Sequence, residues 1–312
     1  MERVHYDEFG LFHENAGEFG IPFDTRPVVR RITTAVSGDR TMSSLVWGAT
    51  EPELVLLHGG GQNAHTWDTV ALALDRPLLA IDLPGHGHSD AGSHDTMTPE
   101  TIALDVATVI RSLAPNATTV VGMSLGGLTA VALTLSSPML VRKMVLVDIT
   151  PGVNAQKSSA IANFVRGPAT FASLDELLQR TVEHNPGRSE SSLRRGILHN
   201  ALQLDDGSWM WRYRRFSAVG LPGVPEARAN IDGESTDLPH FGRLWTAIEQ
   251  SSVPLLLARG MRPQSVVDDA DVAELIRRRP DCQIVEFPDA GHSVQGDSPV
   301  ELARTIAAFA SA

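Results

Sequence analysis

A serine between two glycines is the residue of this chain best placed to do chemistry. Residues 122–126 read G-M-S-L-G, with Ser124 at the centre, after a β-branched run at 117–121 and before an apolar run at 128–133. These runs predict a buried strand and the first turns of a helix. A sharp turn between them would project the hydroxyl above a sheet at a helix N-terminus, where negative charge is stabilised. The pattern indicates a serine nucleophile; the alternative is that Ser124 only caps the helix.

Strands alternate with helices on either side of this serine. Four short apolar strands are predicted between residues 53 and 150, at 53–57, 77–81, 117–121 and 141–147. Alternation of this kind indicates an α/β fold with a mostly parallel central sheet and helices on both faces. Ligands of such sheets bind at the carboxyl ends of the strands. Four polar residues follow directly on strand ends and are expected to share one rim: His58, Asp82, Ser124 and Asp148.

The sheet is expected to extend beyond these strands in both directions along the chain. Two β-rich runs at 28–36 and 41–47 are joined by the turn sequence S-G-D-R, which predicts a hairpin. Strand signals return at 253–258 and 283–287, and a helix is predicted over 298–310. The predicted sheet therefore draws strands from both sides of a long intervening segment.

The intervening segment differs in composition from the rest. Strand signals fade there, and helical stretches such as 174–184 stand in their place. We expect a helical lid inserted after the sixth strand. The predicted organisation is an N-terminal extension at 1–27, an α/β core formed by 28–151 and 246–312, and a lid at 152–245.

Composition narrows the class of partner. The formal net charge of −11 argues against nucleic acid, which requires a basic surface. No apolar run is long enough to span a membrane, and the first residues, MERVHYDEFG, lack the pattern of a signal peptide, so a cytoplasmic location is expected. No metal-ligand pattern and no dinucleotide fingerprint is present, so no metal or cofactor is expected. The expected partner is a small-molecule substrate, and a homodimer stays open.

Four segments together resemble the α/β-hydrolase superfamily, and the resemblance extends from about residue 28 to the C-terminus. They are HGGGQ at 58–62, DLPGHGHSD at 82–90, GMSLGG at 122–127 and AGHS at 290–293. Within the superfamily the chain is similar to the lidded esterases, the C–C hydrolases and the non-haem haloperoxidase-like enzymes. The resemblance implies the α/β-hydrolase fold and a serine hydrolase that needs no cofactor.

The resemblance gives these segments roles in acyl transfer. Ser124 would be the nucleophile, and His292, between the last strand and the last helix, would be the base that activates it. The oxyanion of the intermediate would be held by the backbone N–H groups of Leu125 and Gly60. Gly61 is the alternative to Gly60.

The acid of the triad is where the chain departs from the commoner pattern of the superfamily. Most members carry an aspartate shortly after the strand equivalent to 253–258, but residues 260–263 read G-M-R-P. Some members carry it at the end of the strand that follows the serine's strand, where Asp148 stands. A carboxylate there could hold the Nδ1–H of the histidine. The alternatives are Asp268 or Asp269, which suit the start of a helix, or an Asp148 that only anchors the next loop.

Weaker signals bear on the pocket. The rim residues His58 and Asp82 are expected to brace turns rather than to act on a substrate. Aromatic and loop residues near the site are candidates for substrate binding, although the aromatic residues of the lid are also typical of a lid core. The candidates are His65, Trp67, Met123, Trp209, Trp211 and Tyr213.

The expected reaction is hydrolysis of a small carboxylic ester or lactone through an acyl-enzyme. A C–C hydrolase of a diketone-type substrate is the nearest alternative enzyme, because the same site would serve it. Two alternatives come from other classes: a ligand-binding receptor that uses the lid as a clamp, and a cofactor-free oxygenase or lyase with His292 as base. A serine at position 124 disfavours epoxide hydrolases and haloalkane dehalogenases, which use a carboxylate nucleophile.

Overall fold

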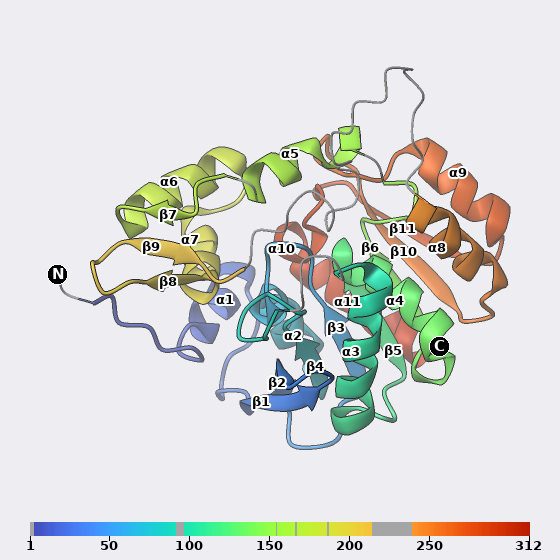
Figure 1. Ribbon diagram of the computed structural model, residues 1–312, viewed down its shortest axis with the longest axis horizontal. Coiled ribbons are helices and arrows are strands. Elements are labelled where there is room, and N and C mark those ends of the chain that lie inside the picture. Colours follow the sequence, from blue (N-terminus) through green and yellow to red (C-terminus); the bar gives the residue numbers. More distant parts are fainter. Residues whose placement is uncertain (1–2, 92–96, 154, 166, 186, 214–238) are drawn as a thin grey trace.

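An eight-stranded β-sheet forms the centre of the structure (Figure 1). The structure, a computed structural model, describes residues 3–91, 97–153, 155–165, 167–185, 187–213 and 239–312. The strands of the sheet are β1 (Val29–Val36), β2 (Arg40–Trp47), β3 (Leu54–Leu57), β4 (Leu78–Ile81), β5 (Thr119–Met123), β6 (Met144–Val147), β10 (Leu255–Gly260) and β11 (Gln283–Phe287). Their spatial order is β1-β2-β4-β3-β5-β6-β10-β11.

The sheet is mostly parallel, as the sequence predicts. The six strands from β4 to β11 in the spatial order all run parallel to their neighbours. β2 pairs antiparallel with both β1 and β4. The predicted hairpin is the β1–β2 pair, in register from Val29 with Trp47 to Val36 with Arg40. The carboxyl ends of the parallel strands therefore meet at one rim, where Ser124 and Asp148 follow β5 and β6.

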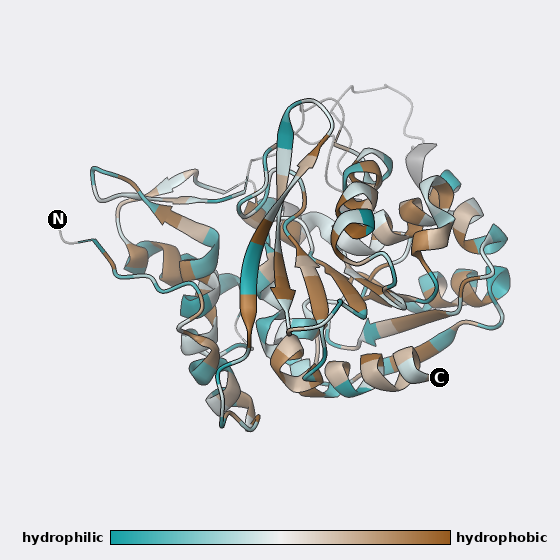
Figure 2. Ribbon diagram, turned by 90° about the horizontal axis from the view of Figure 1, so that it is seen from below, coloured by the Kyte–Doolittle hydropathy of each residue, from teal (hydrophilic) through white to brown (hydrophobic). Residues whose placement is uncertain are grey.

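Helices cover both faces of the sheet. One face carries α3 (Pro99–Leu113), α4 (Leu125–Ser136), α8 (Pro239–Gln250) and α9 (Asp269–Arg278), and the other carries α1 (Phe12–Phe19), α2 (Asp68–Leu74) and α11 (Pro299–Ser311). Side chains of β3 alternate between the two cores, with Val55 and Leu57 in one and Leu54 and Leu56 in the other. The central strands are accordingly hydrophobic on both sides (Figure 2).

Among the described residues, no helix has the length and apolar character needed to cross a membrane.

The chain leaves the sheet between β6 and β10, and we call the described residues 155–213 the inserted segment. It contains α5 (Ala155–Val165), α6 (Leu174–His184), α7 (Glu190–Asn200) and the short strands β7 (Thr170–Phe171), β8 (Ala201–Gln203) and β9 (Trp209–Trp211). The strands form a separate antiparallel sheet in the order β7-β9-β8. The segment contains three helices, as expected, but also three short strands that the sequence did not predict, because strands of two or three residues give no detectable periodicity. Residues 214–238 of the predicted lid lie outside the described residues, and 239–245 belong to α8, which packs on the core.

The N-terminal segment packs onto the core. Phe12 of α1 is 1% exposed, and its ring centroid lies 4.8 Å from that of Trp47 on β2. On the side facing the inserted segment, α1 meets Arg195 of α7, which pairs with Glu18 and lies 3.5 Å from Glu14. The N-terminal segment thus connects the core to the inserted segment (Figure 1).

Replacing Phe12 by alanine should lower the free energy of unfolding by roughly 3–5 kcal/mol, because the change leaves a cavity beside Trp47. Urea unfolding followed by tryptophan fluorescence measures the loss. The control is Met139→Ala, since that side chain is 83% exposed and its removal should cost less than about 0.5 kcal/mol. Equal losses in the two variants would mean that α1 is not part of the cooperative fold.

Candidate active site

Ser124 occupies a sharp turn between β5 and α4. Its backbone φ is +50°, a strained conformation for a residue other than glycine. Close backbone approach explains the two glycines of the motif. A Cβ on Gly122 would lie 2.4 Å from the carbonyl oxygen of Gly126, and one on Gly126 would lie 2.3 Å from that of Leu57. Leu125 is the first residue of α4, so its N–H has no partner within the helix.

A cavity of about 1020 Å³ brings Ser124 and His292 together. Its walls come from the loops after β3 and β10, from α5 and from the turn before α7. In the described part of the chain, the Ser124 hydroxyl makes no hydrogen bond to the imidazole. Such contacts are often long in enzymes without substrate and tighten in the complex. The cavity therefore contains a hydroxyl and a base in one compartment.

His292 lies in the loop between β11 and α10 (Val294–Asp297) and is 8% exposed. Its Nδ1 lies 3.0 Å from Oδ2 of Asp148. An ionised carboxylate can only accept, so Nδ1 carries the proton and donates it to this hydrogen bond. In the neutral ring Nε2 is then the acceptor, which is the tautomer that a general base for a serine requires.

Asp148 follows β6 and is fully buried. Besides His292, three donors reach its carboxylate. The N–H of Gly260 and the hydroxyl of Ser265 donate to Oδ1 at 2.9 and 2.6 Å, and the N–H of Val266 donates to Oδ2 at 3.0 Å. The loop after β10, which carries the acid in the commoner pattern, here supplies these donors. The buried carboxylate is thus fully hydrogen-bonded.

Neither of the two alternative acids contacts His292, although Asp268 lines the same cavity. Asp268 is the N-cap of α9, accepts the N–H of Asp271 at 3.0 Å and pairs with Lys157 at 2.7 Å. The side chain of Asp269 is 94% exposed and pairs with Arg259 at 2.7 Å. Among the described residues, Asp148 is the one carboxylate that contacts the ring of His292.

The loop after β3 lies against the serine turn. A Cβ on Gly59 would be 2.4 Å from Sδ of Met123. The N–H of Gly61 already donates to Nε2 of His86 at 3.0 Å, whereas the N–H of Gly60 has no hydrogen-bond partner within the described ranges. Gly60 is therefore the better placed of the two candidate oxyanion donors, and it lines the cavity together with Leu125.

His58 and Asp82 hold turns, as the sequence predicts. Nδ1 of His58 donates to the carbonyl of the next residue at 2.8 Å, and Nε2 accepts the N–H of Leu83 at 2.9 Å. Burial lowers the pKa of His58, which favours the neutral ring that these two bonds require. Burial would raise the pKa of Asp82, but the charge of Arg31 and the N–H of Ala64 outweigh it and lower that pKa.

Three pocket candidates near the serine have different environments. Met123 lines the large cavity. His65 lines a separate cavity of about 180 Å³. Trp67 lines neither of these two cavities, because it is completely buried in the core against α2, so a role in substrate binding is wrong for it.

The aromatic candidates of the inserted segment form its core. Trp209, Trp211 and Tyr213 are buried in one hydrophobic cluster with Phe171. Trp209 and Trp211 alternate along β9 and so face the same side. Trp211 also borders the small cavity, whereas Trp209 and Tyr213 line neither cavity. These residues pack the inserted segment rather than the wall beside Ser124.

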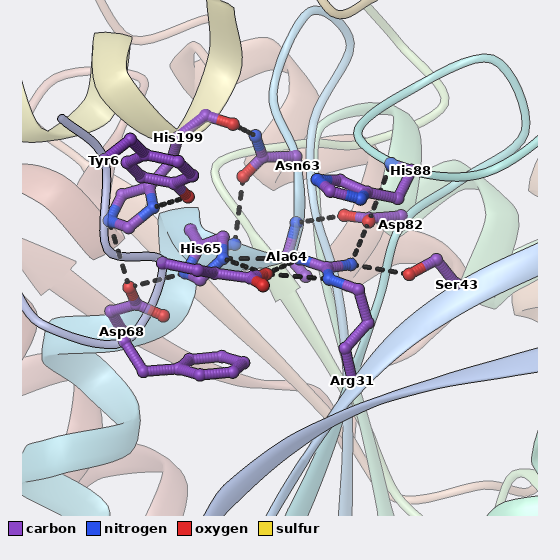
Figure 3. Close-up of polar contacts among 12 residues, drawn as sticks. Tyr6, Arg31, Ser43, Asn63, Ala64, His65, Asp68, Asp82, His88 and His199 are labelled. Atoms are coloured by element: carbon purple, nitrogen blue, oxygen red, sulfur yellow. Dashed lines mark hydrogen bonds and ion pairs between the residues drawn. The ribbon is translucent and has the colours of Figure 1, made fainter. Parts of the chain in front are cut away.

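A buried polar network that the sequence did not predict joins distant parts of the chain (Figure 3). His65 donates from Nδ1 to Asp68 at 2.8 Å and from Nε2 to Glu8 at 3.1 Å. The ring of His199, at the end of α7, stacks on His65 with centroids 3.9 Å apart, and its Nδ1 lies 2.7 Å from the hydroxyl of Tyr6. We call these five residues the histidine clamp, because they join the N-terminal segment, the loop after β3 and α7.

The protonation state of each residue in the histidine clamp depends on its burial and on its charged neighbours. Burial would lower the pKa of His65, but Asp68 and Glu8 raise it to about 9. Burial would raise the pKa of Glu8, but hydrogen bonds from His65 and Arg31 lower it to about 2. Burial beside the charged His65 moves the pKa of His199 well below its ordinary value. At neutral pH a charged and a neutral imidazole therefore stack.

Three residues of the histidine clamp are of types that can ligate a metal. One nitrogen each from His65 and His199 and a carboxylate oxygen of Asp68 lie within 4.8 Å of one another. The two rings are only 11° from parallel, so their in-plane lone pairs run side by side and do not converge on one point. Both nitrogens of His65 also carry protons, which they donate to Asp68 and Glu8, so neither has a lone pair for a metal. The arrangement fits a hydrogen-bonded clamp better than a metal centre.

Comparison with known proteins places the chain in a family. Residues 54–305 match the model of the alpha/beta hydrolase family, and the chain belongs to that family. The predicted fold and the prediction of a hydrolytic enzyme of this class are thereby confirmed.

Individual relatives cover nearly the whole chain. The chain is 39% identical over 316 aligned positions to the esterase Rv0045c of Mycobacterium tuberculosis, covering 98% of this chain and 97% of that protein. A solved structure of that esterase, studied together with its inhibition by transition metals, has a TM-score of 0.82 and 38% identity and covers 99% of this chain and 100% of that one. The 3-hydroxybutyrate-oligomer hydrolase of Cupriavidus necator is 28% identical, covering 86% of this chain and 92% of that protein.

The raised pKa of His65 in the histidine clamp predicts that the folded protein loses stability at alkaline pH. The pKa of His65 is raised to about 9 in the folded state from about 6.5 in an unfolded chain, so its contribution is complete below pH 6.5 and disappears as the pH rises through 9. Each unit of the shift corresponds to about 1.4 kcal/mol, so the total is on the order of 3 kcal/mol. Urea unfolding between pH 6 and 9.5 measures this loss.

A His65→Gln variant should lack this part of the pH dependence, whereas His13→Gln, a change at an exposed histidine, should follow the wild type. Parallel curves for wild type and His65→Gln would show that His65 is not charged in the folded protein.

Proposed function

We propose that this protein is a serine esterase that hydrolyses a small carboxylic ester or lactone through an acyl-enzyme. One observation carries the proposal: Ser124, on a strained turn, shares a cavity with His292, whose Nδ1–H is held by the buried Asp148. The 39% identity to an esterase over nearly the full length supports ester bonds as the target.

In this mechanism the imidazole moves one proton in each half of the reaction. Nε2 of His292 takes the proton of the Ser124 hydroxyl while the oxygen attacks the carbonyl carbon, and Asp148 stabilises the imidazolium. The N–H groups of Gly60 and Leu125 bind the oxyanion. The imidazolium then gives its proton to the leaving alkoxide, and the alcohol departs. Water, deprotonated by the same nitrogen, attacks the acyl carbon; the bond to the Ser124 oxygen then breaks, the imidazolium returns its proton to that oxygen, and the acid is released.

The inserted segment is proposed to act as the lid of this site. It supplies one wall of the large cavity through α5, from which Ile161, Phe164 and Val165 line the space. Ile149 and Val153, just after β6, continue this apolar surface. An apolar wall of this kind favours an acyl chain and keeps water away from the acyl-enzyme until the alcohol has left.

Ser124→Ala should reduce turnover of p-nitrophenyl acetate and butyrate to the background rate, a loss on the order of 10⁶-fold in kcat, because no acyl-enzyme can form. Stopped-flow release of p-nitrophenol measures both the burst and the steady state. Ser159→Ala, a change on α5 in the wall of the same cavity, should stay within about threefold of wild type. Undiminished activity of Ser124→Ala would exclude the serine mechanism. Wild type that is folded but inactive on every ester would direct attention to C–C substrates.

Asp148→Asn should reduce kcat by roughly 10⁴-fold, because an amide can donate to Nδ1 and so favours the wrong tautomer of His292. Asp268→Asn is the matched change at the alternative acid. It should keep activity near wild type, since asparagine also caps a helix. Kinetics with one ester and circular dichroism on all variants separate the two. A severe loss in Asp268→Asn with little loss in Asp148→Asn would reassign the acid.

A further inference from the structure

Three basic side chains line the cavity that contains Ser124: Lys157, Arg188 and Arg262. Lys157 has two carboxylate partners at 2.7 Å. The side chain of Arg262 is 39% exposed and lies 3.8 Å from Asp289. Both of these cations are therefore compensated by a carboxylate, and Arg262 is also partly solvated.

Arg188 forms no ion pair with any described residue. Its Nη2 donates to the hydroxyl of Ser192 at 2.6 Å, and its Nε is buried without a hydrogen-bond partner. Asp297 and Glu18 are the nearest compensating charges, but each is engaged elsewhere: Asp297 accepts a backbone N–H at 2.9 Å and Glu18 pairs with Arg195. The guanidinium thus keeps unused donors inside the protein.

Arg188 packs against α10, the short helix that follows His292. A Cβ on Gly296 would lie 2.9 Å from its Cζ, and Gly296 belongs to α10, four residues after His292. The side chain borders both the large and the small cavity. The surrounding protein lowers the pKa of Arg188 by desolvation, yet part of its surface stays accessible because it faces these cavities. A molecule bound at Ser124 can therefore extend to this guanidinium.

The charge and the shape of the Arg188 guanidinium indicate which kind of ligand would bind there. A charge that is removed from water without a partner is destabilising, and an anion in the cavity would offset that cost. The planar fork of a guanidinium matches the two oxygens of a carboxylate. A phosphate dianion fits less well, since the other two cations of the cavity already have carboxylate partners.

We propose that Arg188 binds a free carboxylate of the substrate. The natural substrate is then an ester or a lactone that also carries an ionised carboxyl group. This inference rests on the proposed esterase function. A half-ester of a dicarboxylic acid is the simplest molecule of this class. Arg188 would then select the substrate and position its carbonyl at Ser124 without taking part in the chemistry.

Matched pairs of substrates test the proposal. Monomethyl esters of C4 to C8 dicarboxylic acids are compared with methyl esters of the same length that end in a carboxamide. A second pair, 4-acetoxybutanoate and 4-acetoxybutanamide, places the carboxylate on the alcohol side. Each pair differs in charge and hardly in shape, and hydrolysis is followed as methanol or alcohol release. Wild type should favour the carboxylate member of at least one pair by roughly 10- to 100-fold in kcat/KM, mainly through KM.

Arg188→Gln should abolish this preference and leave kcat/KM for the carboxamide esters within about threefold of wild type, which also shows that the variant is folded. Arg188→Lys should restore part of the preference, because the charge returns without the fork. Arg262→Gln is the control at the exposed arginine of the same cavity and should retain the preference.

Three results would overturn the inference: no preference in wild type, an equal loss on charged and neutral esters in Arg188→Gln, or loss of the preference in Arg262→Gln alone. The proposed function has its own test within the same experiment. If wild type cleaves the carboxamide esters through Ser124 without a charge preference, the esterase proposal stands and only the role of Arg188 fails. If wild type cleaves none of these esters and no p-nitrophenyl ester, the esterase proposal itself fails.

Discussion

The buried carboxylate of Asp148 is the point at which the loops of the site are joined. β6 and β10 are neighbours in the sheet, and the N–H of Asp148 donates to the carbonyl of Ala258 at 2.8 Å, so the carboxylate emerges beside the loop that follows β10. That loop closes over it with the N–H groups of Gly260 and Val266. The remaining acceptor position goes to His292. A buried charge without these donors would be strongly destabilising. The need to hydrogen-bond this carboxylate therefore fixes the positions of both the loop after β10 and the imidazole.

This arrangement is consistent with the proposal that the acid of the triad stands after β6 and serves the same chemistry there. The ends of β6 and β10 lie side by side at one rim, so either can present an oxygen to a histidine that arrives from the loop after β11. When the carboxylate stands after β6, the β10 loop supplies donors in its place, here from Gly260 to Val266. Asp148 itself has a φ of +46°, which shows that the backbone turns sharply to direct the side chain. With Asp148 as the proposed acid, the departure from the commoner pattern is an exchange of roles between two adjacent loops.

The features that could be predicted from the sequence depend on residues that are close together in the chain. The features that could not be predicted depend on contacts between residues far apart in the chain. The strands of the large sheet and the turn at Ser124 follow from short apolar runs and glycines, and the close approach of Gly126 to Leu57 gives the physical reason. The stacking of His65 on His199 joins residues that are 134 positions apart, and nothing in either local sequence signals it. Trp67 is an aromatic residue close to the HGGGQ loop in the sequence, yet it is completely buried in the core beside the helix that it precedes. Tertiary packing decides these cases, and residue type alone does not distinguish them.

Helix α7 connects the proposed recognition of substrate to the proposed oxyanion site. Arg188 stands just before its first turn, and at its other end Asn200 donates to the carbonyl of Gly61 at 2.7 Å. Asn63, in the same loop after β3, donates to the carbonyl of His199 at 2.9 Å (Figure 3). The helix is thus bonded directly to the loop that presents the N–H of Gly60. Since a short helix moves as a rigid unit, a carboxylate that fixes Arg188 would also hold the loop that presents the proposed oxyanion donor, so that the proposed binding of substrate and the proposed oxyanion site share one rigid support.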